Sequence, residues 1–228
     1  MQQRHSKFVS TRVKKEEASP TTAERGNLIT VVTCTNATGT YLLPVIVFPR
    51  KNTKQELMDG APAGLISACH PSGWIQKVMF TKWFDHSVHL VKLSPDDPVL
   101  MIADGHSHTK NLDVVDKAWE HSVATVSLPS HSTHIMQPLD VGFMKPLKAY
   151  YAQEIETWLS SSPGRVVTPF VVCKLFGSAY RRAATMEASV NSFTKTGLFP
   201  CNRHIFQDMN SHVGEWTNLK INVRWRWQ

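Results

Sequence analysis

Two runs of apolar and β-branched residues open the predicted structure of this chain. The runs are LITVVTCT at 28–35 and TYLLPVIVF at 40–48, and the turn sequence Asn-Ala-Thr-Gly separates them. This pattern predicts a β-hairpin. Pro44 inside the second run predicts either an edge strand or a β-bulge, because proline has no N–H to donate to a neighbouring strand.

Helical and strand patterns alternate in the following segments. Helical spacing of apolar residues occurs at 80–93 and 112–122, and short strand-like runs occur at 99–104 and 124–129. One further helix is expected from Asp140 to about Ser160, and another from Thr168 and Pro169 to about Thr185. The first of these would place one set of side chains on a single face: Met144, Leu147, Tyr151, Ile155 and Trp158. Segments 49–74 and 191–206 have the composition of loops, and Trp83, Trp119 and Trp158 are expected in the core.

This order of elements predicts an α/β fold with a mixed sheet. An antiparallel hairpin comes first, and later strands are joined by helical crossovers. Residues 1–26 are polar and mixed in charge, so weak order is expected there. Residues 27–210 are expected to form one domain, and residues 211–228 a C-terminal tail.

Composition narrows the class of protein. The chain has 228 residues, 42% of them hydrophobic, and a net charge of +7 that favours polyanions, nucleic acid first, as partners. Its four cysteines form no CxxC pair, which argues against a zinc ribbon and favours a reducing compartment. The sequence shows no signal peptide, and its longest apolar run has eight residues, so no membrane partner is expected.

Two aspartates stand where strand and helix boundaries are predicted. Asp104 is the last residue of the strand-like run at 99–104, and Asp140 opens a predicted helix. Sites in open α/β sheets lie beyond the carboxyl ends of strands, and two or three converging carboxylates hold divalent metal ions for phosphodiester cleavage. The alternative for each is a capping role, since aspartate often caps a turn or a helix.

Four blocks of the sequence carry a family resemblance. They are ERGNLITVVTCTNATGTYLLPVIVFPRK, MIADGHSHTKNLDVVDKA, LPSHSTHIMQPLDVGFMKPLKAYY and TKTGLFPCNRHIF. Together they resemble the DDE superfamily endonuclease domain of pogo/Tigger and jerky-like transposases, over residues 5 to 210. The resemblance implies a ribonuclease-H-like fold with extra C-terminal helices, a nuclear location, and DNA strand cleavage and transfer by an acidic triad binding Mg²⁺ or Mn²⁺. Asp104 matches the second acid of that triad, and Asp140 matches the third.

The chain departs from the family pattern at the first acid. In the family this acid lies in a strand upstream of the ERG hairpin, and the earlier acids here, Glu16, Glu17 and Glu24, lie in the polar segment. The first strand is therefore expected to be missing, with no helix-turn-helix region in residues 1–27, and the chain as given is expected to be inactive. Three hypotheses follow: a fragment of a longer nuclease, a non-catalytic nuclear DNA- or protein-binding scaffold, or an unstable product of a decayed element.

Histidines and lysines near the two aspartates are candidates for nucleic-acid binding. The residues are His106, Lys110, His131, Lys145 and Lys148, which could contact phosphate groups. For the lysines, an ordinary solvated helix face is an equal alternative. The histidine pairs His106/His108 and His131/His134 also have spacings that permit zinc binding. DNA is thus the expected partner, and a homo-oligomer is possible.

Overall fold

The computed structural model describes residues 28–91, 98–104, 112–129 and 132–205. Its strands are β1 (Thr30–Thr35), β2 (Tyr41–Phe48), β3 (Ile66–Cys69), β4 (Val99–Ala103) and β5 (Val123–Ser127). Its α-helices are α1 (Lys77–Val91), α2 (Leu112–Glu120), α3 (Thr133–Met136), α4 (Met144–Ser161), α5 (Pro169–Ala183) and α6 (Met186–Lys195). A 3-10 turn, η1 (Gln55–Met58), and a π-helical turn, η2 (Leu139–Phe143), complete the described elements.

The predicted hairpin is confirmed, and it settles the two interpretations of Pro44. β1 and β2 pair antiparallel, with a register shift between Val32 and Cys34. β2 is a central strand, because β3 pairs with its other edge in parallel. The edge-strand interpretation is therefore wrong, and the bulge interpretation is confirmed. The register passes from Val45 to Leu42 across the buried Pro44. The N–H that proline lacks is therefore absent at the irregular part of the ladder.

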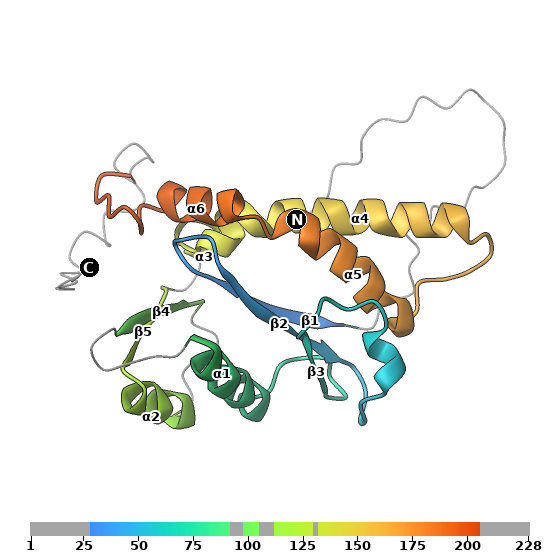
Figure 1. Cartoon of the computed structure of the whole chain (residues 1–228), viewed down its shortest axis with the longest axis horizontal. Helices are drawn as coiled ribbons and strands as arrows, with labels where there is room; N and C mark the ends of the chain where they lie inside the picture. The colour runs from blue at the N-terminus through green and yellow to red at the C-terminus, as the bar shows by residue number, and fades with distance from the viewer. Residues whose placement is uncertain (1–27, 92–97, 105–111, 130–131, 206–228) are drawn as a thin grey trace.

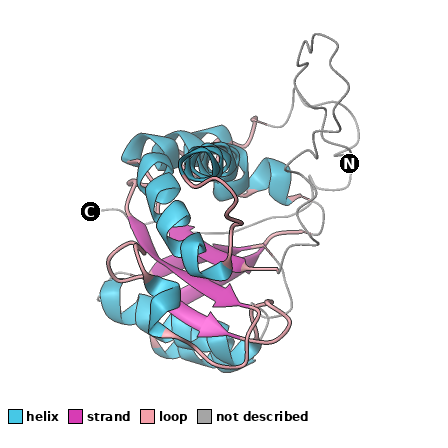
Figure 2. Cartoon of the chain, turned by 90° about the vertical axis from the view of Figure 1, so that its right-hand side faces the viewer, coloured by secondary structure: helices cyan, strands magenta, loops and turns pink. Residues whose placement is uncertain are grey.

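The mixed α/β class predicted from the sequence is confirmed and agrees with a ribonuclease-H-like domain. β4 and β5 pair in parallel, and α2 forms the crossover between them, as the pattern at 99–129 predicts. Within the described residues the strands form two sheets, one of three strands and one of two. Figures 1 and 2 show α4, α5 and α6 on one side of the strands and α1 and α2 on the other.

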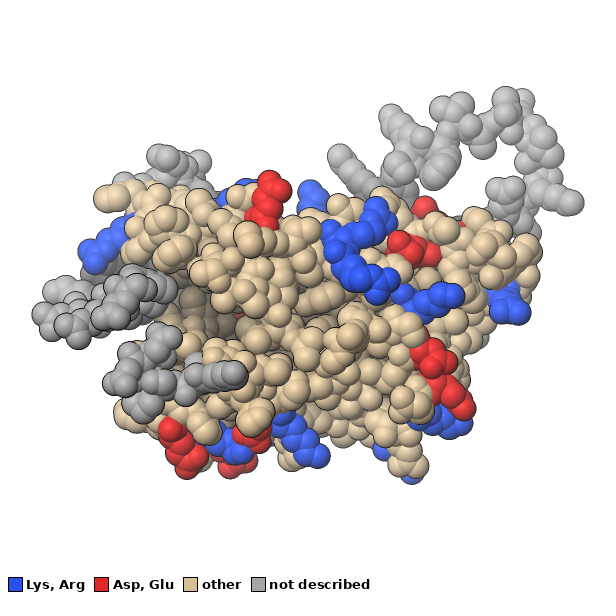
Figure 3. Space-filling view, viewed as in Figure 1, with Lys and Arg blue, Asp and Glu red and all other residues tan. Residues whose placement is uncertain are grey.

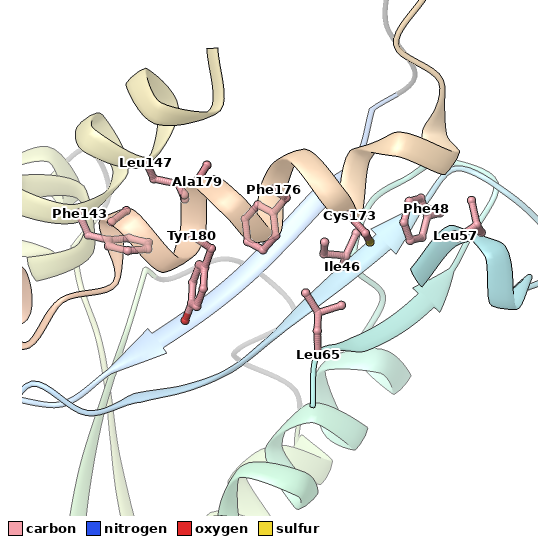
Figure 4. Close-up of a cluster of buried hydrophobic side chains, with 11 residues drawn as sticks. Ile46, Phe48, Leu57, Leu65, Phe143, Leu147, Cys173, Phe176, Ala179 and Tyr180 are labelled. Carbon is pink, nitrogen blue, oxygen red and sulfur yellow. The ribbon is translucent and has the colours of Figure 1, made fainter. Parts of the chain in front are cut away.

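Alternate side chains of β2 supply two separate cores. Ile46 and Phe48 point into a cluster with Phe143 of η2 and with Cys173 and Phe176 of α5 (Figure 4). Val45 and Val47 enter a second cluster, built mainly from α1, α2 and β5: Ile75, Phe80, Trp83, Phe84, Val114, Ala118 and Val123. Because successive strand residues face opposite sides, this burial on both faces explains why β2 is a continuous apolar run.

η1, β3 and the end of α6 lie where loops were predicted. β3 occupies four residues, Ile-Ser-Ala-Cys, too few and too mixed in polarity for an alternation pattern to show. α6 extends through Lys195, so the loop prediction at 191–206 is wrong at its start. The N-cap of α6 is Thr185, whose Oγ1 accepts a hydrogen bond from the Ala188 N–H at 3.1 Å.

The prediction for tryptophan burial is confirmed only in part. Trp83 is buried in the second core and Trp158 is half-buried. Trp119, near the end of α2, is 82% exposed, so its predicted core position is wrong. The buried face of α2 consists of Val114 and Ala118, four residues apart, which turns Trp119 toward solvent. No helix among the described residues has the length and hydropathy needed to cross a bilayer.

Candidate functional site

Asp104 follows β4 directly, at the carboxyl end of the parallel pair. Ala103 is the last residue of β4 and is in register with Ser127 at the end of β5. The Leu128 N–H donates a hydrogen bond to the Ala103 carbonyl at 2.8 Å, which holds the two strand ends together. Asp104 is half-buried. The strand-end position predicted for this carboxylate is therefore correct.

Asp140 lies in η2, between α3 and α4. The N-cap of η2 is Pro138 and no side-chain bond caps this turn, so the capping interpretation of Asp140 is wrong. The Asp140 N–H donates to the Gln137 carbonyl at 3.0 Å. Asp140 itself is exposed, whereas Pro138 on one side and Phe143 on the other are buried.

Aromatic packing fixes the position of η2. Phe143 is 1% exposed, and its ring centroid lies 5.3 Å from that of Tyr41 and 5.9 Å from that of Tyr180. These two partners come from β2 and α5, so the turn is anchored to the sheet and to the helical layer at once. Burial raises the pKa of Tyr41 and of Tyr180 above their usual range. The anchor leaves Asp140, three residues earlier, facing solvent.

The α6 helix supports the same turn from its other side. Gly142 of η2 approaches Ser192 of α6 so closely that a Cβ at this glycine would lie 2.0 Å from the Ser192 Oγ. Ser189 of α6 in turn donates a hydrogen bond to the Asn36 carbonyl at 2.8 Å, in the turn between β1 and β2. The hairpin, α6 and η2 therefore position the backbone around Asp140.

Asp140 lines an open hollow of about 630 Å³ along the start of α4. The other polar side chains of the hollow are His134, Lys145 and Lys148, and Met144, Ala149 and Ala152 complete its wall. The structure thus brings three of the predicted site residues together: Asp140, Lys145 and Lys148. Both lysines are exposed, so their ammonium groups can reach an anion in the hollow.

Of the other predicted site residues, the structure describes only Asp104. Asp104 is not among the residues that line the hollow. His106, Lys110 and His131 lie outside the described residues, as does His108 of the zinc alternative. His134, a member of one of the two histidine pairs, lines the hollow.

A second group of cations was not predicted. Lysine and arginine side chains gather over α5 on the face shown in Figure 3, and this helix carries Lys174, Arg181 and Arg182. The Arg182 guanidinium lies 4.1 Å from the Tyr150 ring centroid and donates to the Glu154 carboxylate at 3.3 Å. The position of Arg182 at the α4–α5 contact indicates a role in packing these two helices, which the sequence pattern does not reveal.

Comparison with known proteins identifies the family. A family model described as DDE superfamily endonuclease matches residues 27–169, more than half of the chain. The chain belongs to this family. The match confirms the resemblance carried by the sequence blocks and supports a transposase-derived nuclease domain.

Two curated relatives cover different shares of the chain. The protein named MFS-type transporter clz9, from Cochliobolus lunatus, is 28% identical over 182 residues, which is 78% of this chain and 19% of that protein. Jerky protein from Mus musculus is 21% identical over 126 residues, 51% of this chain and 22% of that protein. The chain therefore spans about a fifth of the length of these relatives. No solved structure matches it.

Endonuclease domains of this family generally use divalent metal ions, which the described residues of this chain suit only in part. The carboxylate oxygens of Asp104 and Asp140 are ligands that suit Mg²⁺ and Mn²⁺. Among the residues that the structure describes, however, no group of three His, Cys, Asp or Glu side chains is placed to hold a metal ion. The described residues do not make a complete metal site.

Proposed function

We propose that this chain is a nuclear DNA-binding DDE endonuclease domain whose ancestral chemistry is metal-dependent strand cleavage and transfer. The family match supports a nucleic-acid substrate class. The observation that carries the proposal is the hollow in which Asp140 lies beside Lys145, Lys148 and His134. A carboxylate among cations suits a phosphate group and a divalent ion: Asp140 would help to hold the ion, and the lysines would bind the phosphate oxygens.

In this proposal, Asp104 and Asp140 are metal ligands of low affinity and Lys145 and Lys148 bind the DNA backbone. His106, Lys110 and His131 are assigned the same phosphate-contacting role from the sequence alone. Each lysine neutralises backbone charge without reading sequence, so its contribution to binding depends on salt. Binding and orientation of DNA are the steps that these residues can perform.

A non-catalytic DNA-binding scaffold is the second candidate function. It is favoured by the donor set, because two carboxylates do not fix the place of a metal ion and the described residues supply no third. Strand cleavage requires reacting groups held in near-attack geometry, and small displacements are costly. We therefore expect this chain, on its own, to bind DNA and to cleave it poorly or not at all.

The proposal is tested by DNA binding and nicking assays on the full chain. Lys145→Gln/Lys148→Gln is compared with Lys77→Gln/Lys82→Gln on α1, which removes the same charge elsewhere. We expect the α4 variant alone to reduce the salt dependence of log K, by a slope of about 1–2 for two phosphate contacts. If the two double variants change the salt dependence of DNA binding equally, Lys145 and Lys148 do not form the DNA-binding surface. If the wild-type chain nicks DNA in the presence of Mn²⁺ and Asp140→Asn does not, the domain is an active nuclease and the scaffold function is refuted.

A further inference from the structure

The α5 helix carries a row of exposed residues on the side that faces away from the first core. Phe170, Lys174 and Arg181 lie within about 40° of one another around the helix axis, at 3.6 residues per turn. All three are exposed, and Figure 3 shows lysine and arginine side chains gathered over this helix. None of the three lines the hollow at the start of α4. We call these three residues the α5 row, and it is a surface separate from the hollow.

The two cations of the α5 row are available to an external anion. Lys174 and Arg181 make no ion pair with a carboxylate in the part of the chain that the structure describes, and α5 itself contains no acidic residue. The Arg181 guanidinium donates a hydrogen bond to the neutral Ser178 hydroxyl at 3.5 Å. Arg182 differs, because its guanidinium is paired with the Glu154 carboxylate. The α5 row therefore keeps its positive charge uncompensated.

An arginine stacked on an aromatic ring lies at one end of the α5 row. The guanidinium carbon of Arg50, two residues beyond the end of β2, lies 5.2 Å from the centroid of the Phe170 ring. Arg50 is half-buried and Phe170 is 36% exposed. Unpaired nucleic-acid bases stack on aromatic rings and on guanidinium planes. In a duplex the faces of the bases are already covered by their neighbours, so this pair favours a single strand.

We propose that the α5 row and Arg50 together bind a single-stranded nucleic-acid segment. One base stacks against the Arg50–Phe170 pair, and Lys174 and Arg181 bind the phosphates that follow it. Phe170 and Arg181 are about 16 Å apart along the helix at 1.5 Å per residue. At roughly 3.4 Å per nucleotide of a stacked strand, this length matches about five nucleotides.

This inference rests on the proposed function in one respect, namely that nucleic acid is the partner. It adds a second surface and assigns to it a different form of that partner. The positive charge alone would also suit an acidic protein. The carboxylates of such a protein have no flat ring to place on the Arg50–Phe170 pair, and the pair therefore favours the nucleic acid.

Fluorescence anisotropy with two DNA probes tests the stacking step. The probes are a labelled oligothymidylate and a labelled DNA hairpin, and the full chain carries Lys145→Gln/Lys148→Gln so that the hollow does not contribute. In this background, we expect Phe170→Leu to weaken oligothymidylate binding about fivefold or more and to leave hairpin binding unchanged. The matched control is Trp119→Leu, which removes a more exposed ring on α2 and should leave the affinity for both probes unchanged.

Salt dependence tests the phosphate contacts separately. In the same background, Lys174→Gln/Arg181→Gln should reduce the slope of log K against log salt for oligothymidylate by about 1.4, the value for two contacts to a single strand. Lys77→Gln/Lys82→Gln on α1 removes the same charge and should leave the slope unchanged. Both changes affect only exposed side chains, so this comparison remains decisive if Phe170→Leu fails to fold, which circular dichroism reports.

Four results would overturn the proposal. The first is that the background chain does not bind oligothymidylate, and the second is that Phe170→Leu and Trp119→Leu weaken its binding equally. The third is an equal loss of hairpin binding in Phe170→Leu. The fourth is polyglutamate binding that Lys174→Gln/Arg181→Gln weakens as much as oligothymidylate binding, because an acidic protein would then be the occupant. The proposed function fails differently, since Lys145→Gln/Lys148→Gln would then leave the salt dependence of duplex binding unchanged.

Discussion

Replacing Gly142 by alanine tests how α6 supports the turn that carries Asp140. A Cβ at this position would lie 2.0 Å from the Ser192 Oγ and 3.1 Å from the Ser192 Cβ. Contacts below about 3 Å are not tolerated, so the Ser192 side chain or α6 must shift. Ser192 is 1% exposed and its hydroxyl donates to the Ala188 carbonyl, so it has no free space to enter.

The expected cost follows from this geometry. Overpacking a buried contact lowers the free energy of unfolding by about 1–3 kcal/mol. The higher helix propensity of alanine offsets up to about 1 kcal/mol of this loss. Gly142→Ala should therefore lower the free energy of unfolding by about 1–2 kcal/mol. In a Ser192→Ala background the offending oxygen is gone and the remaining 3.1 Å contact is tolerable. There the same substitution should change stability by less than about 0.5 kcal/mol.

Urea unfolding followed by circular dichroism measures both differences. The matched control background is Thr194→Ala, which removes an exposed α6 hydroxyl that donates to a helix carbonyl, that of Val190, at 3.0 Å. Gly142→Ala should keep its full cost there, because Thr194 does not approach Gly142. Equal costs of Gly142→Ala in the Ser192→Ala and Thr194→Ala backgrounds would refute the proposed contact between η2 and α6.

Two further predictions concern the first core. Phe143→Ala should lower the free energy of unfolding by about 3–5 kcal/mol, as expected for a buried aromatic ring. Phe170→Ala should lower it clearly less, because Phe170 is 36% exposed. Similar urea midpoints for the two variants would contradict the role of Phe143 in anchoring η2. Burial raises the pKa of the Cys173 thiol from 9.0 to about 11. Because the unfolded chain then loses this proton first, the contribution of Cys173 is complete below pH 9 and is lost between pH 9 and 11. The stability of Cys173→Ala should fall less steeply over that range, and parallel pH curves would show that the thiol is not buried.

Features encoded in adjacent residues could be predicted from the sequence. The hairpin follows from two β-rich runs and the turn Asn36–Gly39, and α5 begins where Thr168 and Pro169 predict it. The meeting of Asp140 with Lys145 and Lys148 is also local, because all three lie within nine residues around the start of α4. The α/β class and the order of β4, α2 and β5 follow from the same kind of pattern.

Features that depend on contacts distant in sequence could not be predicted. β3 is defined by its parallel pairing with β2 rather than by its own four residues. The exposure of Trp119 depends on which face of α2 meets the second core, and α6 is placed by Ser189 against a turn some 150 residues earlier. The division of the strands into two sheets is a property of pairing, which no single run of residues shows.

The most direct test of the proposed function is to locate Mn²⁺ on the full chain by paramagnetic line broadening in NMR spectra. We expect the amides next to Asp104 and next to Asp140 to broaden together at the same Mn²⁺ concentration, and Asp104→Asn to abolish both effects. Broadening confined to one of the two aspartates, or centred on the exposed acids Glu56 and Asp59 of the η1 region, would contradict a shared metal position and leave the domain as a DNA-binding scaffold.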